Sequence, residues 1–233
     1  MALTLRGNGQ LSADNYGIDS DGSITATGIT STGNAGIGTS SPTNYANYST
    51  LTLNDTNGGV LEFKKGNTQV SRISNANDQA LQFVTNGSER MRVDASGRVT
   101  TPYQPAFYWT KTSTQTATSS SQVVIWDSSK VNTGNHFNNQ RFTAPVAGVY
   151  LFQLFTLSLG DTATNDTHII KNGSTIMSRQ RNSTGTQHET TACSAIISLS
   201  VNDYVEVQLG AVNDVVYGDF GDGWSGFSGH LIG

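Results

Sequence analysis

The chain has 233 residues, of which 35% are hydrophobic and 13% charged, and its formal net charge is −4 at pH 7. It has no run rich in Lys or Arg, which argues against nucleic acid or an anionic membrane surface as a partner. The single cysteine, Cys193, excludes an intrachain disulfide. No stretch approaches the roughly 20 apolar residues of a membrane span, so we expect no membrane insertion.

The composition predicts an all-β protein. Glycine accounts for 25 residues, and no long apolar stripe with a helical period occurs. The apolar residues stand instead in short alternating runs between turn residues. The N-terminal residues lack the apolar core of a secretory signal. These features together suit a component of a virus particle, made in a reducing cytosol and working outside the cell.

Residues 1–48 hold isolated apolar residues, among them Ile18, Ile24 and Ile29, between Gly, Ser, Thr and Asn. One copy of such a segment cannot bury a core. A disordered leader is one interpretation. We favour extended segments that attach to the virion or wrap around sister chains, because isoleucine recurs here with Thr and Gly rather than with charge.

Residues 49–100 show short runs of alternating polarity. Leu61 and Phe63 share one face of such a run, and Glu62 and Lys64 share the other. Similar runs, separated by Gly-containing turns, are LTLND, ALQFVTNG and RMRVDASGRV. They predict a hairpin meander with too few large apolar residues to be stable alone. We therefore expect several chains to stack their meanders around an axis.

Two phrases in this part resemble the repeated spacer of bacteriophage fibre proteins. They are GIGTSSP at residues 36–42 and SERMRVDASGRV at residues 88–99. The resemblance covers roughly residues 33–100, implies a fibre shaft and names no activity. Residues 49–100 are therefore predicted to form a thin β shaft.

Residues 101–233 carry the longest apolar runs. The strand at residues 204–209 alternates, with Val205, Val207 and Leu209 predicted inward and Tyr204, Glu206 and Gln208 outward. The stretch at residues 141–157, RFTAPVAGVYLFQLFTL, is instead apolar on both faces. A strand with one wet face would alternate apolar and polar residues. We expect one face of this strand to be covered by its own domain and the other by another copy of the chain.

The C-terminal part is similar to the globular head of the complement component 1q family, within the tumour-necrosis-factor-like superfamily. The resembling phrases, in family order, are PAFYW (105–109), VNTGNHF (131–137), RFTAPVAGVYLF (141–152), IIKNG (169–173), VNDYVEVQ (201–208) and FSGHLIG (227–233). The resemblance implies a jelly-roll sandwich that forms a homotrimer, with Val149, Leu151 and Phe155 at the contact between chains. The ending His-Leu-Ile-Gly departs from the aromatic or larger apolar residues usual in the family, which puts the packing of the last strand in question.

Residues of catalytic and metal-binding types are scattered. The four histidines stand in no HExxH or CxxC setting, and each is expected to be a surface or turn residue: His136 (beside Phe137), His168, His188 and His230. Cys193 is expected to be a small buried residue. Lys171, Arg179 and Arg181 form a small basic group, interpreted as a solvated hairpin. No nucleophile elbow or paired catalytic carboxylates are found, so we expect no enzyme.

The segment DFGDGWSG at residues 219–226 gathers the candidate contact residues for a host surface, Asp219, Phe220, Asp222 and Trp224. In the resembled fold the last strand runs antiparallel to the first, which puts this loop at the end of the domain away from the shaft. A tryptophan with carboxylates and glycines can hold a sugar by stacking and hydrogen bonds. A plain connecting loop is the alternative. We expect no cofactor; calcium is the alternative, because some members of the resembled family bind it near the trimer axis.

These observations predict a trimeric tail fibre of a bacteriophage, located in the virion. The segment 1–48 would bind a tail or capsid protein, residues 49–100 would form the shaft, and residues 101–233 a knob that contacts host glycan or protein without catalysis. A capsid head fibre with the same knob is the first alternative. A polysaccharide-degrading tailspike is the second, and a secreted lectin-like cellular protein the third.

Overall fold

The computed structural model describes residues 35–37, 43, 46, 49–66, 68–75, 79–159, 164–183, 188–218 and 223–233. The chain divides into two compact units, Met1–Gly59 and Val60–Gly233. In the first unit β1 (Ala35–Ile37) and β2 (Leu51–Leu53) pair in parallel. The predicted extended segment lies mostly outside the described residues, as do residues 38–42 of the GIGTSSP phrase.

The described residues contain strands and turns and no helix, which confirms the all-β prediction. Within this part of the chain there is accordingly no helix of the length and apolar character that crossing a membrane requires.

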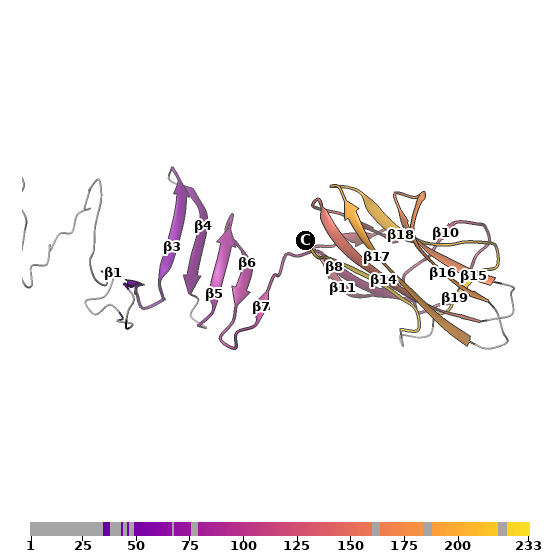
Figure 1. Ribbon diagram of the computed structural model, residues 1–233, viewed down its shortest axis with the longest axis horizontal. Coiled ribbons are helices and arrows are strands. Elements are labelled where there is room, and N and C mark those ends of the chain that lie inside the picture. The colour runs from indigo at the N-terminus through magenta and orange to yellow at the C-terminus, as the bar shows by residue number, and fades with distance from the viewer. Residues whose placement is uncertain are drawn as a thin grey trace, which may run out of the picture. The chain divides into compact units, whose positions relative to one another are not determined.

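The second unit begins with a five-stranded antiparallel meander (Figure 1). Its strands are β3 (Val60–Lys65), β4 (Thr68–Asn75), β5 (Leu81–Thr85), β6 (Ser88–Val93) and β7 (Val99–Thr100), paired in chain order. The register places Leu61 opposite Ile73, Ile73 opposite Phe83 and Phe83 opposite Met91. These side chains therefore share one face of the sheet, as alternation predicts. The division of the chain at residues 48 and 100 stays a prediction.

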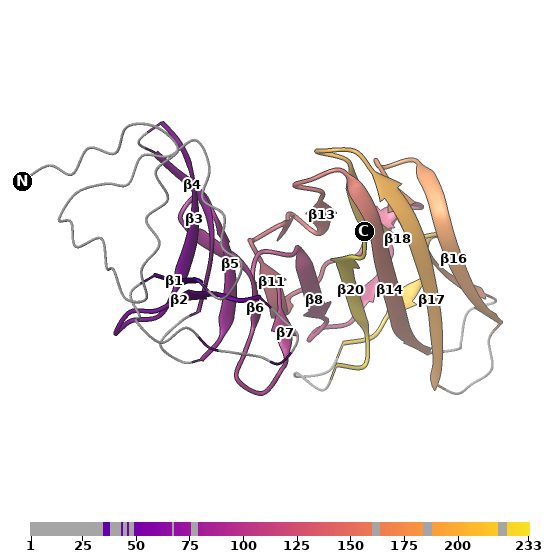
Figure 2. The same ribbon diagram turned by 60° about the vertical axis from the view of Figure 1, so that its left-hand side comes forward.

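The rest of the unit is a jelly-roll sandwich, as predicted. Its strands are β8 (Ala106–Thr110), β9 (Gln115–Thr116), β10 (Gln122–Val123), β11 (Ser128–Thr133), β12 (Phe137–Asn138), β13 (Arg141–Thr143), β14 (Gly148–Leu159), β15 (Thr164–Lys171), β16 (Thr175–Ser183), β17 (His188–Leu199), β18 (Tyr204–Leu209), β19 (Val215–Val216) and β20 (Gly226–Leu231). One layer has the order β12-β13-β18-β15-β16, with β10 also paired to β18. The other has the order β11-β8-β20-β14-β17, and Figure 2 shows β8, β20, β14 and β17 side by side.

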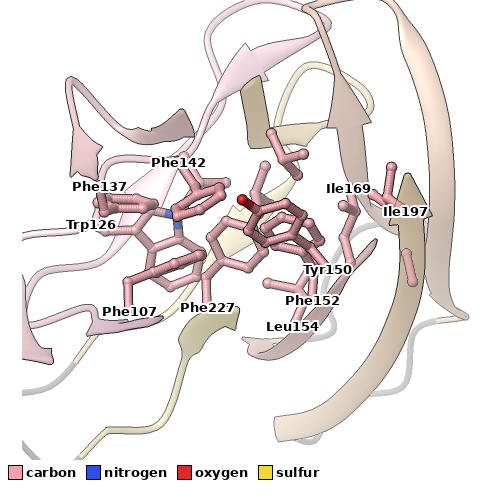
Figure 3. Close-up of a cluster of buried hydrophobic side chains, with 14 of the residues drawn as sticks. Phe107, Trp126, Phe137, Phe142, Tyr150, Phe152, Leu154, Ile169, Ile197 and Phe227 are labelled. Carbon is pink, nitrogen blue, oxygen red and sulfur yellow. The ribbon is translucent and has the colours of Figure 1, made fainter. Parts of the chain in front are cut away.

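Aromatic rings fill the space between the two layers (Figure 3). The ring of Phe107 lies 4.8 Å from that of Phe137, 5.1 Å from that of Phe227 and 5.2 Å from that of Phe142, measured between centroids. A Cβ atom at Gly229 would come within 2.6 Å of the ring of Phe152, so the last strand needs a glycine there. Such dense packing of rings stabilises the sandwich from within.

The inward residues of β18 are where the sequence places them, since Val205, Val207 and Leu209 are fully buried. The outward prediction for Glu206 and Gln208 is wrong in one respect, because both side chains are also buried. They satisfy each other, with the Gln208 amide Nε2 donating to Glu206 Oε1 at 2.8 Å. A buried polar pair on the outward face leaves the alternation of the strand unchanged, and so the sequence pattern does not reveal its burial.

The first and last strands of the sandwich fix its two ends. β20 runs antiparallel to β8, with Phe227 opposite Trp109 and His230 opposite Ala106, as predicted. The carbonyl of Gly233 accepts a hydrogen bond from the Val149 amide at 2.6 Å, at the end where the chain enters β8 (Figure 1). We call this end the base, and the opposite end, which holds Tyr217 and Trp224, the far end. Leu231 packs against the core, so the unusual C-terminal residues leave the last strand well packed.

Candidate functional site

Two surfaces of the sandwich carry the residues that the sequence singles out, and the first is one face of β14. Alternate residues of this strand, Tyr150, Phe152 and Leu154, point into the core and are almost fully buried. Val149 lies on the opposite face and is 37% exposed, while Leu151 and Phe155 are half-buried there. The outward face of the strand is therefore apolar at these three positions and polar at the exposed Gln153 between them, and only the inward face belongs to the core of its own domain.

The neighbouring strands extend this outward face. Leu151 stands opposite Ile196 of β17, whose side chain is 67% exposed. Phe155 stands opposite Ala192 of β17 and opposite Gly226 of β20. A Cβ atom at Gly226 would lie 2.6 Å from the Phe155 ring, so the glycine leaves room for that ring. We call the set Val149, Leu151, Phe155 and Ile196 the outward patch.

The second surface lies at the far end, around Trp224. This side chain is 40% exposed, whereas Asp219, Phe220 and Asp222 lie outside the described residues. Both ends of the segment that carries Trp224 are held by one residue of β14. The Tyr217 amide donates to the Leu157 carbonyl at 2.9 Å, and the Leu157 amide donates to Ser225 Oγ at 3.0 Å. The long strand β14 thus anchors the loop at both of its bases.

Two aromatic residues that sequence reasoning missed accompany Trp224. The ring of His188, at the start of β17, lies 5.2 Å from the ring of Tyr217 and 6.4 Å from that of Trp224, edge to face in both cases. His188 was predicted to be a plain surface histidine, and it is exposed. Nothing in its local sequence predicts the contact, because its partners are about thirty residues further along the chain. We call Trp224, His188 and Tyr217 the far-end aromatic cluster.

An exposed cluster of rings offers flat apolar surface with polar groups at its edge. Such a surface can stack against the apolar face of a sugar, while ring N–H and O–H groups bind hydroxyls. The contact role predicted for Asp219, Phe220, Asp222 and Trp224, and the interface role predicted for Val149, Leu151 and Phe155, remain predictions.

The remaining histidines do not gather into a site. Burial lowers the pKa of both His136 and His168, and His230 is exposed on β20. Among the residues that the structure describes, no three His, Cys, Asp or Glu side chains lie close enough to hold a metal ion. Cys193 is half-buried against the core, where burial raises the pKa of its thiol.

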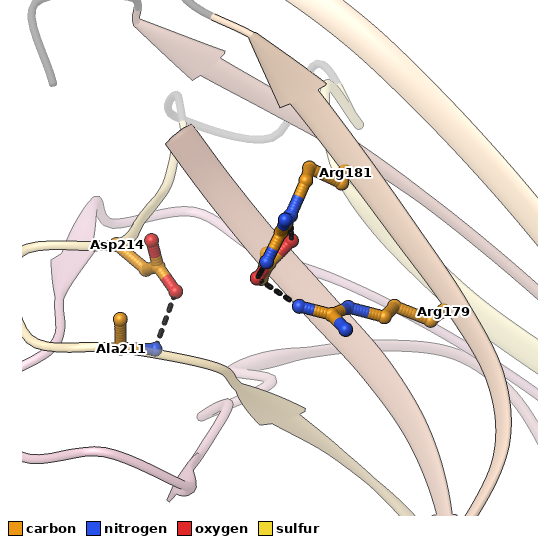
Figure 4. A network of polar contacts seen from close by, with 5 residues as sticks. Arg179, Arg181, Ala211 and Asp214 are labelled. Carbon is orange, nitrogen blue, oxygen red and sulfur yellow. Dashed lines mark hydrogen bonds and ion pairs between the residues drawn. The ribbon is translucent and has the colours of Figure 1, made fainter. Parts of the chain in front are cut away.

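The basic group lies on the β15–β16 hairpin with Arg179 and Arg181 about half exposed, as a solvated hairpin requires, but its cations are paired with carboxylates that the sequence analysis did not name. Arg181 Nε donates to Asp166 Oδ1 at 2.6 Å, and Arg179 Nη2 donates to Asp166 Oδ2 at 2.5 Å (Figure 4). These guanidinium groups, that of Arg181 foremost, lower the pKa of the Asp166 carboxyl to about 2. Lys171 pairs separately with Asp203 at 2.8 Å. The three cations are therefore paired with two carboxylates in two places, and they do not form one basic surface.

The family model of the C1q domain matches residues 106–232, which is more than half of the chain. The chain belongs to the C1q domain family. The matched range runs from the first strand of the sandwich to its last, so membership rests on the C-terminal domain alone.

Two curated relatives match part of this C1q protein. Complement C1q tumor necrosis factor-related protein 3 of Mus musculus is 31% identical over 111 residues, which are 47% of this chain and 44% of the relative. The protein of the same name from Homo sapiens is 30% identical over 111 residues, with the same coverage. The chain thus spans less than half the length of the curated relatives it matches.

Solved structures of two kinds are similar to the sandwich. The globular domain of zebrafish complement 1qA is 20% identical, with a TM-score of 0.46, and the match covers 56% of this chain and 98% of that one. Murine APRIL, in a crystal structure at pH 8.5, is 12% identical with a TM-score of 0.45, covering 55% of this chain and 99% of that one.

Proposed function

We propose that the protein is a homotrimeric bacteriophage tail fibre whose C1q domain contacts the host cell surface by binding, without catalysis. The phrases GIGTSSP and SERMRVDASGRV support the fibre assignment, because they resemble the spacers of such fibres. The outward patch is the observation that carries the trimer. The far-end aromatic cluster supports the role in recognition.

The outward patch needs a cover that the described part of the chain does not provide. Val149 on β14 and Ile196 on the neighbouring edge strand β17 expose much of their side chains, next to the half-buried Leu151 and Phe155. Full burial of an aliphatic or aromatic side chain contributes about 1.5–3 kcal/mol. Apolar patches of this kind on a folded domain mark an interface. Two further copies of the chain, each offering the same patch, are the cover that we propose.

The meander supports the same assembly independently. Its register aligns Leu61, Ile73, Phe83 and Met91 on one face of a single-layered sheet. Phe63, on the same face, is 50% exposed. A sheet of this size with one open apolar face is marginal alone. Sister chains that face each other across an axis would bury these side chains and make a continuous fibre of shaft and head.

Light scattering on the purified full chain tests the trimer. We expect a mass three times that of the 24.8 kDa chain, persisting on dilution. A stable monomer or dimer would overturn the trimer and, with it, the proposed fibre.

The role in recognition is tested at Trp224. The substitution Trp224→Ala removes the exposed ring at the far end, and we expect particles carrying it to lose most of their adsorption to the host. Three copies acting together multiply the loss, because multivalent binding amplifies small changes at each site. Val201→Ala is the matched control, since it trims another exposed apolar side chain, at the base. Equal adsorption by both variants would exclude the far-end cluster as the contact.

A capsid head fibre is the second candidate, and the resemblance of residues 33–100 to fibre spacers favours it equally. Labelling of residues 1–35 and imaging of particles separates the two, since the label would lie on the tail or on the head. A degrading tailspike predicts release of oligosaccharide from host capsule, whereas a binding fibre releases none.

A further inference from the structure

The sandwich contains a second place where a ligand fits, away from both surfaces described above. A cavity of about 220 Å³ lies beside the β12–β13 hairpin. Its lining consists of three aromatic and three amide side chains: Trp109, Trp126, Phe137, Asn138, Asn139 and Gln140. We propose that this cavity binds one neutral sugar ring, an inference that rests on the proposed function only in taking host glycan as the ligand.

The cavity lies at one edge of the sandwich. β12 is the edge strand of one layer and β11 the edge strand of the other, whereas β16 and β17 form the opposite edge. Figure 3 shows Trp126 and Phe137 at one end of the aromatic core and Ile197 at the other. The outward patch is on β14 and β17, so an assembly that buries this patch leaves the hairpin edge free.

The aromatic walls are held rigidly by the core. The ring of Phe137 lies 5.2 Å from that of Trp109, and the ring of Trp126 stacks 6.0 Å from that of Phe227. Trp126 is 1% exposed. Phe137, at 3% exposed, and Trp126 thus support the wall from behind. The partly exposed Trp109 is the ring that offers stacking surface, without the entropy cost of ordering a flexible side chain on binding.

The hairpin turn sets the amides in place. Asn139 and Gln140 have φ angles of 49° and 65°, as a two-residue turn between antiparallel strands requires. Gln140 Oε1 accepts a hydrogen bond from the Trp126 amide at 2.7 Å, and Asn138 Oδ1 accepts one from the Asn139 amide at 2.8 Å. The side-chain oxygens of Gln140 and Asn138 are therefore held by backbone amides. The NH2 groups of both side chains remain available as donors to hydroxyl oxygens.

A second observation points to a missing acceptor. The indole nitrogens of Trp109 and Trp126 are buried and have no hydrogen-bond partner among the residues that the structure describes. Buried donors in native proteins are almost always paired, so two orphans in the lining of one cavity call for an explanation. Oxygen atoms of a bound ligand would supply the acceptors once the neighbouring side chains shift, because neither nitrogen is exposed in this structure.

The lining also sets the chemical class of the ligand. Among the residues that the structure describes, no Asp, Glu, Lys, Arg or His lines the cavity, so a charged group would enter without a counter-charge and at a large desolvation cost. The volume is below the roughly 300–1,000 Å³ typical for drug-sized ligands. Apolar rings combined with amide donors suit a small, neutral, hydroxyl-rich ring. An unsubstituted hexose, or its N-acetyl form, fits this description.

Tryptophan fluorescence of the full chain can test the proposal directly. The chain has three tryptophans, and two of them line the cavity. In a Trp224→Phe background, the emission therefore reports on the cavity alone. We expect at least one of glucose, galactose, mannose and N-acetylglucosamine to change this emission saturably. If none of them changes it, the proposal is wrong.

A matched pair of variants keeps the test specific. The first variant combines Asn138→Ala with Asn139→Gly, which suits the positive φ and removes a lining amide. It should raise the dissociation constant of the sugar about tenfold, the loss expected for hydrogen bonds worth about 1.4 kcal/mol. Asn135→Gly makes the same change at a neighbouring exposed turn with a φ of 56°, outside the cavity, and should leave the constant unchanged. Equal constants in all variants would place the sugar elsewhere and overturn the proposal.

This result is separable from that of the adsorption experiment. Trp224→Ala reports on the far end, whereas the fluorescence titration is carried out with that tryptophan already replaced. Loss of adsorption without a titration signal would overturn the cavity proposal and keep the proposed function; the reverse result would keep the cavity and overturn the far-end contact.

Discussion

The sandwich and the meander have the same alternating strand patterns, but the sandwich buries its apolar faces and the meander leaves one exposed. In the sandwich two sheets face each other, and Phe142, Phe152 and Phe227 are fully buried between them. The meander is one sheet, and Phe63 on its apolar face is half exposed. The comparison teaches that alternation specifies a strand and its faces, while the presence of a second layer decides whether the faces are satisfied within one chain.

The largest expected effect is in the core of the sandwich. Phe152→Ala should destabilise the domain by about 3–5 kcal/mol, because it leaves a cavity among rings that cannot collapse onto it. Denaturant unfolding followed by fluorescence measures the change. Phe63→Ala in the meander is the matched substitution, and it should leave the unfolding of the sandwich unchanged. Similar losses in the two variants would contradict the contrast between the regions.

The meander should respond at the level of assembly instead. Phe63→Ala removes an exposed ring that sister chains are proposed to bury, and each chain should then lose about 1.5–3 kcal/mol of association free energy. The oligomer would dissociate at higher protein concentration than the wild-type protein, as measured by light scattering on dilution. Lys65→Ala, at an exposed position of the same strand, is the control. Unchanged dissociation would mean that the meander face is not part of the interface.

The fold was largely predictable from the sequence because alternation fixes which face each residue takes. The strands at residues 60–65, 81–85 and 88–93, and the inward residues of β18, lie where the pattern predicts them. The strand β4 was missed, because in TQVSRISN only Val70 and Ile73 are large and apolar. Its pairing with β3 and β5 follows from the two hairpins that join it to these strands, and its own residues do not predict it.

The candidate sites were predictable only where they are local in sequence. Trp224 stands out because glycines surround it in one loop. His188 and the cavity at Trp109 and Trp126 were not found, because each depends on residues brought together from distant strands. Contacts between strands far apart in the chain leave no periodic signal. The pairing of Arg179 and Arg181 with Asp166 was missed for another reason: it crosses the β15–β16 hairpin, whose register the sequence analysis did not predict.

A smaller effect is expected at the ion pairs, and it again separates the two regions. Asp166→Asn should cost about 1–2 kcal/mol, because the Asp166 carboxylate is buried and binds two arginines. Glu62→Gln, which removes the exposed pair with Lys64 at 3.0 Å, should cost less than about 0.5 kcal/mol. Urea unfolding at neutral pH measures both. Equal losses would show that burial of the acid does not strengthen its pairs.

The same carboxylate predicts a pH dependence. Its pKa in the folded chain is about 2, held there by Arg181 and then Arg179, and an unfolded Asp has a pKa of about 3.9. A group with a depressed folded pKa contributes stability above the unfolded value, and this contribution is lost as the pH falls from about 4 towards 2. Over that window wild-type stability should fall more steeply than that of Asp166→Asn. Parallel curves would show that Asp166 does not carry the dependence.

The smallest expected effect on stability is at Trp224, where function should respond most. Its ring is 40% exposed and packs on His188 at the surface rather than on the core, so Trp224→Ala should change the free energy of unfolding by less than about 0.5 kcal/mol. Denaturant unfolding of this variant, measured alongside its adsorption, separates the two roles. A loss of adsorption with unchanged unfolding would mean that the ring is kept for contact with a partner. A loss of stability comparable to that of Phe152→Ala would instead mean that the far-end aromatic cluster is an extension of the core. The contrast between a buried interior that stabilises the domain and a surface kept for binding would then not hold at Trp224.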